Sequence, residues 1–163
     1  MSTTLEGTTR TGLAARIINE GYGTGAWHGP DLKAALADVT SEMAFWRPGP
    51  DRHNIAEIAL HHAYCVRNVR AKLTGVEAAP FVLEGDDWFP LPDASRLSWS
   101  AILGIIEQEQ ARLAEIAAGI DAGRVRSALS DPEQVDIVLG ITCHAVYHAG
   151  QIQLIKKLRR SLT

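Results

Sequence analysis

Two histidines stand four residues apart in the segment HAVYHAGQIQLIKK, at positions 144 and 148. On a helix, residues with this spacing share a face and their Cβ atoms lie about 5 to 6 Å apart, so both imidazoles can reach one ion at about 2.0 to 2.1 Å. The same spacing also occurs in core or surface histidines that bind nothing. A metal site therefore needs a third ligand from elsewhere in the chain.

The burial expected for these histidines strengthens the argument for a metal. His144, His148 and Gln151 continue an otherwise aliphatic helical stripe made of Ile137, Ile141 and Ile155. Burying an imidazole or amide without a partner costs about 1 to 3 kcal/mol. We therefore predict one bound divalent metal ion. Histidine suits several ions, of which zinc and nickel are the expected candidates.

A second pair of histidines, His61 and His62, can supply the third ligand. His62 lies on the same helical stripe as the apolar residues Ile55, Ala59, Val66, Val69 and Leu73. His61 shares its face with Glu57, Ile58 and Cys65. Periodicity slightly favours His62, and the residues by themselves leave the choice open.

Helix signals around these residues predict the elements that position them. The helix carrying His61 should start after Asn54, a capping residue, and end at Gly75. An earlier helix should begin at Pro30 and end before Pro48, because a proline suits the first turn of a helix and interrupts its interior. Both helices are then joined by a short connection.

The second half of the chain is predicted to contain two more helices, which follow a long connection. Residues 76–97 contain three prolines and two adjacent aspartates, which predicts a crossover loop. Ser98 should cap a third helix that ends within 119–123, and Asp131 should cap a fourth. Residues 13–20 could form one or two further helical turns. The predicted fold is all-α, a four-helix bundle with a long crossover between its second and third helices.

Composition is that of one water-soluble domain. The 163 residues suit a single domain, 1–163, with a flexible N-terminus over residues 1–12; 46% are hydrophobic and 21% charged. A net charge of -3 argues against nucleic acid as a partner. The sequence shows no signal peptide or membrane span, and Cys65 and Cys143 are expected to stay as thiols. A cytoplasmic protein is therefore predicted.

The histidine segments resemble a known family, the DinB/YfiT-like superfamily of small four-helix metalloproteins. The family's fourth-helix signature of two histidines followed by Gly-Gln is matched by His144, His148, Gly150 and Gln151. The segment HNIAEIALHH is similar to the second-helix pattern, in which the ligand lies eight residues after the opening histidine. This resemblance implies that the third ligand is His61.

The resemblance also suggests residues around the ligands. WHGPDLKAALADVT is similar to the family's first-helix start, which lies near the bundle mouth, so Trp27 and His28 are expected to line a pocket, with Trp88 as an alternative. Gln151 is expected to orient a ligand. Glu57 is expected either to accept a hydrogen bond from the free ring nitrogen of His61 or to be an exposed acid near a helix start.

Several side chains near the predicted site have a structural alternative. Cys65 could be a fourth ligand or a small buried thiol, with the thiol favoured. His62 is expected to be a packed or interface residue, and His53 a hydrogen-bonding residue at the helix start. Cys143 is given no role.

Three histidine ligands leave at least one position open on the ion, as in catalytic zinc sites. Relatives in the superfamily include thiol S-transferases and a mycothiol-dependent isomerase. By analogy, we expect a metal-dependent thiol S-transferase or detoxification enzyme, with a small-molecule thiol and an electrophile as partners. The alternatives are a metal-dependent hydrolase and a non-catalytic metal-binding stress or interaction protein. The resemblance also implies a homodimer.

Overall fold

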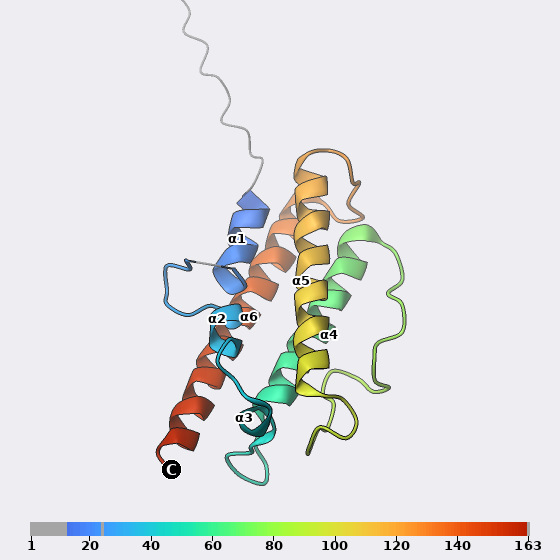
Figure 1. Cartoon of the computed structure of the whole chain (residues 1–163). Helices are drawn as coiled ribbons and strands as arrows, with labels where there is room; N and C mark the ends of the chain where they lie inside the picture. Colours follow the sequence, from blue (N-terminus) through green and yellow to red (C-terminus); the bar gives the residue numbers. More distant parts are fainter. Residues whose placement is uncertain (1–12, 24, 163) are drawn as a thin grey trace, which may run out of the picture.

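The computed structural model describes residues 13–23 and 25–162, which form six α-helices and no β-strand (Figure 1). The all-α prediction is confirmed. The terminal segment 1–12, expected to be flexible, lies outside the described residues. The helices are α1 (Leu13–Gly21), α2 (Leu32–Leu36), α3 (Ser41–Phe45), α4 (Ile55–Thr74), α5 (Trp99–Asp121) and α6 (Asp131–Arg160).

Helix α4, which carries His61 and His62, begins and ends at the predicted residues. The side chain of Asn54 accepts a hydrogen bond from the backbone N–H of Glu57, and the Glu57 carboxylate accepts one from the backbone of Asn54. Gly75 ends the helix in the left-handed conformation, with φ at 69°, which glycine adopts without a Cβ clash. These two caps fix the register of α4.

Helices α5 and α6 also start at polar caps. Ser98 accepts a hydrogen bond from the backbone N–H of Ala101, as predicted for α5. The cap of α6 is Ser130 rather than the expected Asp131. The backbone N–H and the hydroxyl of Ser130 both donate to the Glu133 carboxylate. Helix α6 therefore begins one residue earlier than the predicted cap would place it, and Asp131 is its first residue.

The predicted first helix is not continuous, and two five-residue helices, α2 and α3, replace it. Asp31 caps α2 by accepting from the N–H of Ala34, and Thr40 caps α3 by accepting from the N–H of Met43. Thr40 is extended, with ψ at 161°, so no helix can pass through it. The periodic apolar residues were detected correctly, but the internal cap at Thr40 was missed.

The fourth side of the bundle is built from short helices. Helix α1 packs against α6 and α5, α2 packs against α6, and α3 packs against α4 (Figure 1). The structure is therefore three long helices covered by three short ones. None of the helices in the described part of the chain is long and apolar enough to span a bilayer.

The connection between α4 and α5, residues 75–98, contains no helix or strand and runs beside α4 (Figure 1). It is held to the bundle by Phe89 and Leu91, which are completely buried. The Asn54 side-chain amide donates to the Leu91 carbonyl oxygen at 2.7 Å. Two apolar anchors and a buried hydrogen bond thus place the preceding residues, Asp87 and Trp88, over the start of α4.

Candidate metal centre

The histidines of α4 and α6 meet where these two helices pack together. The Nε2 atom of His144 lies 3.0 Å from Nε2 of His61 and 3.1 Å from Nε2 of His148. Two ligand atoms each about 2.0 to 2.1 Å from a tetrahedral ion are about 3.3 Å apart. The distance from Nε2 of His144 to each of these two neighbours is therefore within a few tenths of an ångström of that expected for two ligands of one ion.

Hydrogen bonding by itself does not satisfy this group of nitrogens. A neutral imidazole has one N–H donor and one lone pair, so His144 has at most one N–H to share between the Nε2 atoms of His61 and His148. Burial, followed by the charges of neighbouring histidines, lowers the pKa of His144 to about 4. Burial also dominates for His148, lowering its pKa to about 4 despite the opposing hydrogen bond to Gln151. Both imidazoles are neutral near pH 7, the form that binds metal.

His61 and His148 each have a hydrogen-bond partner for Nδ1, the ring nitrogen that does not face His144. Nδ1 of His61 lies 2.9 Å from the backbone oxygen of Asp87 and 3.0 Å from its carboxylate. Nδ1 of His148 lies 2.6 Å from the side-chain oxygen of Gln151, whose amide donates to the Tyr147 hydroxyl. Donation from Nδ1–H to these oxygens leaves both Nε2 lone pairs free to face His144.

His62 takes part in this cluster from the opposite side of His144. Its Nδ1 lies 2.8 Å from Nδ1 of His144, and its Nε2 lies 2.8 Å from the side-chain nitrogen of Gln110 on α5. His62 is completely buried, and burial is the main cause of its pKa lying well below the ordinary value. The sequence did not decide between His61 and His62 as the third ligand. In the structure both contact His144, His61 at Nε2 and His62 at Nδ1.

This arrangement links the tautomer of His144 to that of His62. If Nε2 of His144 binds an ion, its proton must sit on Nδ1 and point at His62. Nδ1 of His62 must then accept, which leaves its Nε2–H to donate to Gln110. The Gln110 side chain can accept this hydrogen bond when its amide is rotated so that the oxygen faces His62. Gln110, His62 and His144 thus form a hydrogen-bonded chain. An ion at Nε2 of His144 would determine which ring nitrogen of each histidine carries the proton.

Cys65 lies one turn after His61, at the edge of the cluster. Its sulfur is 3.9 Å from Nε2 of His61 and 3.9 Å from the Asp87 carboxylate. Burial and the nearby Asp87 charge raise the pKa of the Cys65 thiol to about 12, so it stays protonated at neutral pH. His61, Cys65 and His144 form a group that can hold a metal ion, with ligand atoms all within 4.8 Å of one another.

Glu57 has neither of the two roles expected for it, because its carboxylate pairs with groups other than His61 and is buried rather than exposed. Its carboxylate is buried and pairs with Arg47 at 2.5 and 3.1 Å and with Nδ1 of His53 at 3.0 Å. It also accepts from the backbone N–H of Leu91 at 2.9 Å. Burial raises the pKa of Glu57, but these hydrogen bonds outweigh it and the net shift is downward. Glu57 therefore fastens the long connection to the start of α4.

Trp27 and His28 lie away from the cluster. Trp27 is 93% exposed, and Nε2 of His28 lies 2.7 Å from the backbone oxygen of Glu20. Neither residue lines the cavity beside His148. Trp88, the third residue expected at the bundle mouth, does line that cavity, and its ring stacks on His61, at 3.9 Å, and on His53, at 3.7 Å.

Asp87, Trp88 and Gln110 surround the histidines, and the sequence predicted no contact with a ligand for any of them, although Trp88 is among the residues expected at the bundle mouth. Asp87 and Trp88 belong to the long connection, where the only signal was two aspartates before a tryptophan. Gln110 carried a usable signal, because it is an amide at a position that proves buried on the inner face of α5. Loop residues have no periodicity that predicts where they fold, and this explains the omission of the other two.

A cavity of about 470 Å³ opens beside His148. Trp88, Tyr147 and His148 form the wall nearest the cluster, and Arg52 and Asp51 lie at the α3–α4 connection. The remaining lining residues are His53, Gln151, Pro48 and the aliphatic side chains of Ile58, Leu154, Ile155 and Leu158. The cavity is thus lined by aliphatic and aromatic side chains together with several polar ones.

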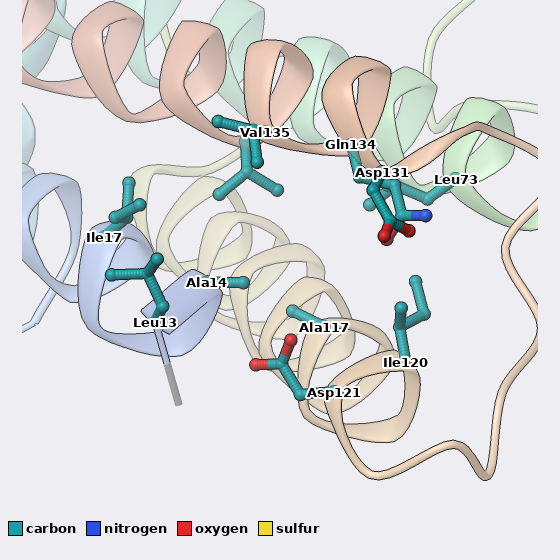
Figure 2. Close-up of a pocket in the computed structure, with 11 residues that line it drawn as sticks. Leu13, Ala14, Ile17, Leu73, Ala117, Ile120, Asp121, Asp131, Gln134 and Val135 are labelled. Carbon is teal, nitrogen blue, oxygen red and sulfur yellow. The ribbon is translucent and has the colours of Figure 1, made fainter. Parts of the chain in front are cut away.

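A second cavity, of about 220 Å³, lies where α4 and α5 end and α1 and α6 begin (Figure 2). Its walls are mainly aliphatic, and Figure 2 shows Asp121 of α5 and Asp131 of α6 at its edge. No histidine or cysteine lines it. It has none of the ligand chemistry of the first cavity.

Comparison with known proteins agrees with the histidine geometry. The model of the DinB superfamily matches residues 26–152, which include all of α4 and the histidines of α6. Searches of curated proteins and of solved structures found no match. The family match covers well over half of the chain, and it contains every residue that the structure brings into the cluster. The protein therefore belongs to the DinB superfamily.

Proposed function

We propose that the protein binds one divalent metal ion, zinc or nickel, through Nε2 of His61, His144 and His148. The proposal is carried by one observation, the approach of two imidazole Nε2 atoms to within 3.0 and 3.1 Å of a third. Three supporting hydrogen-bond partners, Asp87, Gln151 and His62, accept from the opposite ring nitrogens. Such partners are typical of metal-binding histidines.

The site is proposed to be catalytic because a ligand can reach it. Three protein ligands leave a coordination position open, and the 470 Å³ cavity lies directly beside His148. A metal site that only stabilised the bundle would need no such space. A cavity of this size, apolar with a few polar groups at one end, is typical of small-molecule sites.

The reaction that we propose is transfer of a small-molecule thiol to an electrophile. A sulfur–carbon bond forms, the bond from that carbon to its leaving group breaks, and the thiol proton is released with the leaving group. When bound, the ion supplies Lewis acidity and lowers the pKa of a thiol held in its open position.

The residues of this chain bind and orient the two reactants. Stacking of Trp88 between His61 and His53 gives the cavity a rigid wall against which a planar or apolar electrophile can lie. Gln151 fixes the ring of His148, and Asp87 fixes the ring of His61. Leu154, Ile155 and Leu158 give the cavity an apolar surface along α6.

The proposal is tested with full-length protein purified without a nickel column and loaded with zinc or with nickel. Conversion of 1-chloro-2,4-dinitrobenzene by cysteine or glutathione should accelerate with metal-loaded protein and not with chelated protein. The acceleration should be lost in His148→Ala and kept in His28→Ala, a matched histidine outside the cluster. Equal rates for loaded and chelated protein with every thiol tested would contradict the transferase proposal.

A metal-dependent hydrolase is the second candidate, and one observation favours it. The imidazole of His53 lines the cavity within stacking distance of Trp88, so a base is available beside the proposed metal position. Metal-dependent hydrolysis of a p-nitrophenyl ester, without any effect of added thiol, would favour this activity. Stoichiometric metal binding with neither activity would leave the non-catalytic stress or interaction protein as the remaining function.

A further inference from the structure

His53 lines the cavity beside His148 but does not belong to the group of histidines that meet at His144. Its ring stacks on Trp88, with the ring centroids 3.7 Å apart and the two planes inclined by only 9°. The same tryptophan meets the His148 ring edge-on, with centroids 6.2 Å apart. His53 is therefore close to the proposed metal position without being one of its ligands.

The carboxylate of Glu57 determines which nitrogen of His53 carries a proton. Nδ1 of His53 lies 3.0 Å from Oε2 of Glu57. An ionised carboxylate can only accept hydrogen bonds, so Nδ1 is the donor and Nε2 of the neutral ring keeps its lone pair. Among the residues that the structure describes, none hydrogen-bonds to this Nε2 atom. His53 therefore offers the cavity a basic nitrogen whose tautomer is already fixed.

Arg47 keeps the Glu57 carboxylate charged although it is buried. The Glu57 side chain is 4% exposed, and two guanidinium nitrogens of Arg47 lie 2.5 and 3.1 Å from its two oxygens. The backbone N–H of Leu91 also donates to it, at 2.9 Å. A buried carboxylate held in its ionised form stabilises a positive charge on a neighbouring imidazole. His53 can therefore take up a proton without becoming an unpaired charge.

The other titratable side chains that line this cavity are poorer proton acceptors. Arg52 is always protonated, and the Tyr147 hydroxyl already accepts a hydrogen bond. Both ring nitrogens of His148 face partners of their own. Asp51 is a carboxylate, and carboxylates are weaker bases than imidazoles. Of these groups, only His53 combines a free imidazole lone pair with a buried charge that can balance the proton.

We propose that His53 is the general base of this site and that Glu57 is its positioning residue. The inference rests on the proposed function, because it assigns a carrier to the proton that the thiol loses. The S–H bond of a thiol in the cavity breaks, its electron pair stays on sulfur, and the proton moves to Nε2 of His53. Nδ1–H stays hydrogen-bonded to Glu57, as in other pairs in which a carboxylate orients a catalytic imidazole.

The second half of the reaction returns His53 to its starting state. The sulfur forms its bond to carbon, and the leaving group departs with the electron pair of the bond that breaks. Nε2 of His53 then gives the proton to the leaving group. One proton is taken up and one is returned, so neither an oxidant nor a further reactant is required.

Proton release during thiol binding tests the base without any turnover. Zinc-loaded full-length protein is titrated with 2-mercaptoethanol in a calorimeter, in buffers of different ionisation enthalpy at about pH 7.5, where an ordinary thiol is mainly protonated. The wild type should release less than about half a proton per thiol bound, because His53 retains the proton. His53→Gln, whose amide can still donate to Glu57, should release about one. His28→Gln, a matched change away from the cavity, should behave like the wild type.

The same titrations separate failure of this inference from failure of the proposed function. Equal proton release by wild type and His53→Gln would overturn the assignment of His53, while thiol binding itself would still support the transferase. Extra release in Asp51→Asn instead of His53→Gln would place the base at Asp51 and also overturn it. If the zinc-loaded wild type binds no thiol, the transferase proposal fails and this inference fails with it.

Rates with two kinds of thiol give an independent test. With 1-chloro-2,4-dinitrobenzene and 2-mercaptoethanol, His53→Ala should be slower than wild type by about 10²- to 10⁴-fold, and added imidazole should restore part of the rate. With an aryl thiol that is already ionised at the assay pH, the variant should be close to wild type, because no proton has to be removed. Equal losses with both thiols and no rescue by imidazole would show that His53 has only a structural role.

Glu57→Gln tests the positioning residue. The variant keeps an oxygen for the backbone N–H of Leu91 but removes the negative charge beside His53. Proton release on thiol binding should lie between those of wild type and His53→Gln, and imidazole should not rescue the rate because the His53 ring is still present. Wild-type proton release by this variant would show that Glu57 only fastens the long connection.

Discussion

The two cavities of the bundle differ in what their buried groups require. The cavity beside His148 is bordered by imidazoles whose nitrogens face one another, whereas the cavity at the other end of α4 is bordered mainly by aliphatic side chains. A buried nitrogen lone pair needs a proton donor or a cation, but an aliphatic side chain needs only close packing. The first region is therefore built for binding, and the second for cohesion.

This difference predicts that substitutions in the two regions change different properties of the protein, metal affinity in one and stability in the other. Substitutions around the histidines should alter metal affinity and leave the stability of the metal-free protein almost unchanged. Substitutions around the aliphatic cavity should alter stability and leave metal affinity unchanged. Each prediction below tests one side of this separation.

His144→Ala should have the largest effect, because Nε2 of His144 is the atom shared by both close contacts. We expect metal affinity to fall by more than about 100-fold, beyond the range seen when only a supporting partner of a ligand is lost. Elemental analysis and titration calorimetry measure this. His28→Ala should keep one equivalent of metal. Full metal content in His144→Ala would place the site elsewhere.

Leu73→Ala tests the aliphatic region. Leu73 is completely buried and lines the second cavity, so removing its side chain enlarges an existing space. A loss of about 2 to 5 kcal/mol in the free energy of unfolding is expected. Urea denaturation of chelated protein measures it. Metal affinity should equal that of the wild type, and a parallel loss of affinity would show that the two regions are coupled.

His62→Phe tests whether the buried neighbour of His144 supports metal binding. Without His62, Nδ1–H of His144 has no acceptor, and metal affinity should fall by about 10- to 100-fold. His62→Gln can offer an oxygen to the same N–H and should recover part of the affinity. If both variants lower the melting temperature of the chelated protein and neither changes affinity, His62 has only a packing role.

Mild acidification should destabilise the metal-free protein through the histidine region. Without a bound ion, burial lowers the pKa of His144 and His148 to about 4, below the unfolded value of about 6.5. Between these values the unfolded chain binds more protons than the folded one, so stability falls as the pH is lowered from about 6.5 to about 4. The melting temperature of the chelated His144→Ala/His148→Ala variant should change less over this range, and an equal change would contradict the assignment.

The sequence was sufficient where a feature depends on neighbouring residues. Caps at Asn54 and Ser98, the glycine stop at Gly75 and the spacing of His144 and His148 are all local, and the structure shows each of them. The break between α2 and α3 is also local, at the cap residue Thr40. The apolar residues keep helical spacing across this break, so the sequence predicted one continuous helix. Helix signals can thus be read from sequence when periodicity and caps agree.

Features of the candidate site that depend on distant segments could not be read in this way. Asp87 and Trp88 reach α4 only because Phe89 and Leu91 anchor an irregular connection in the core. The contact of Glu57 with Arg47 rather than with His61 depends on the path of the chain before α4. Such paths are set by packing across the bundle, which leaves no periodic trace in the sequence.

By itself the sequence determined that the chain is helical, where its long helices begin, and that two histidines share one helical face, because 3.6 residues per turn and cap chemistry act over a few residues. Only the tertiary structure decided how His61 and His62 divide the two ring nitrogens of His144, and which side chains surround them. Those contacts join residues that are more than 80 positions apart in the chain. The rotation of one helix against another is fixed by the packed core as a whole.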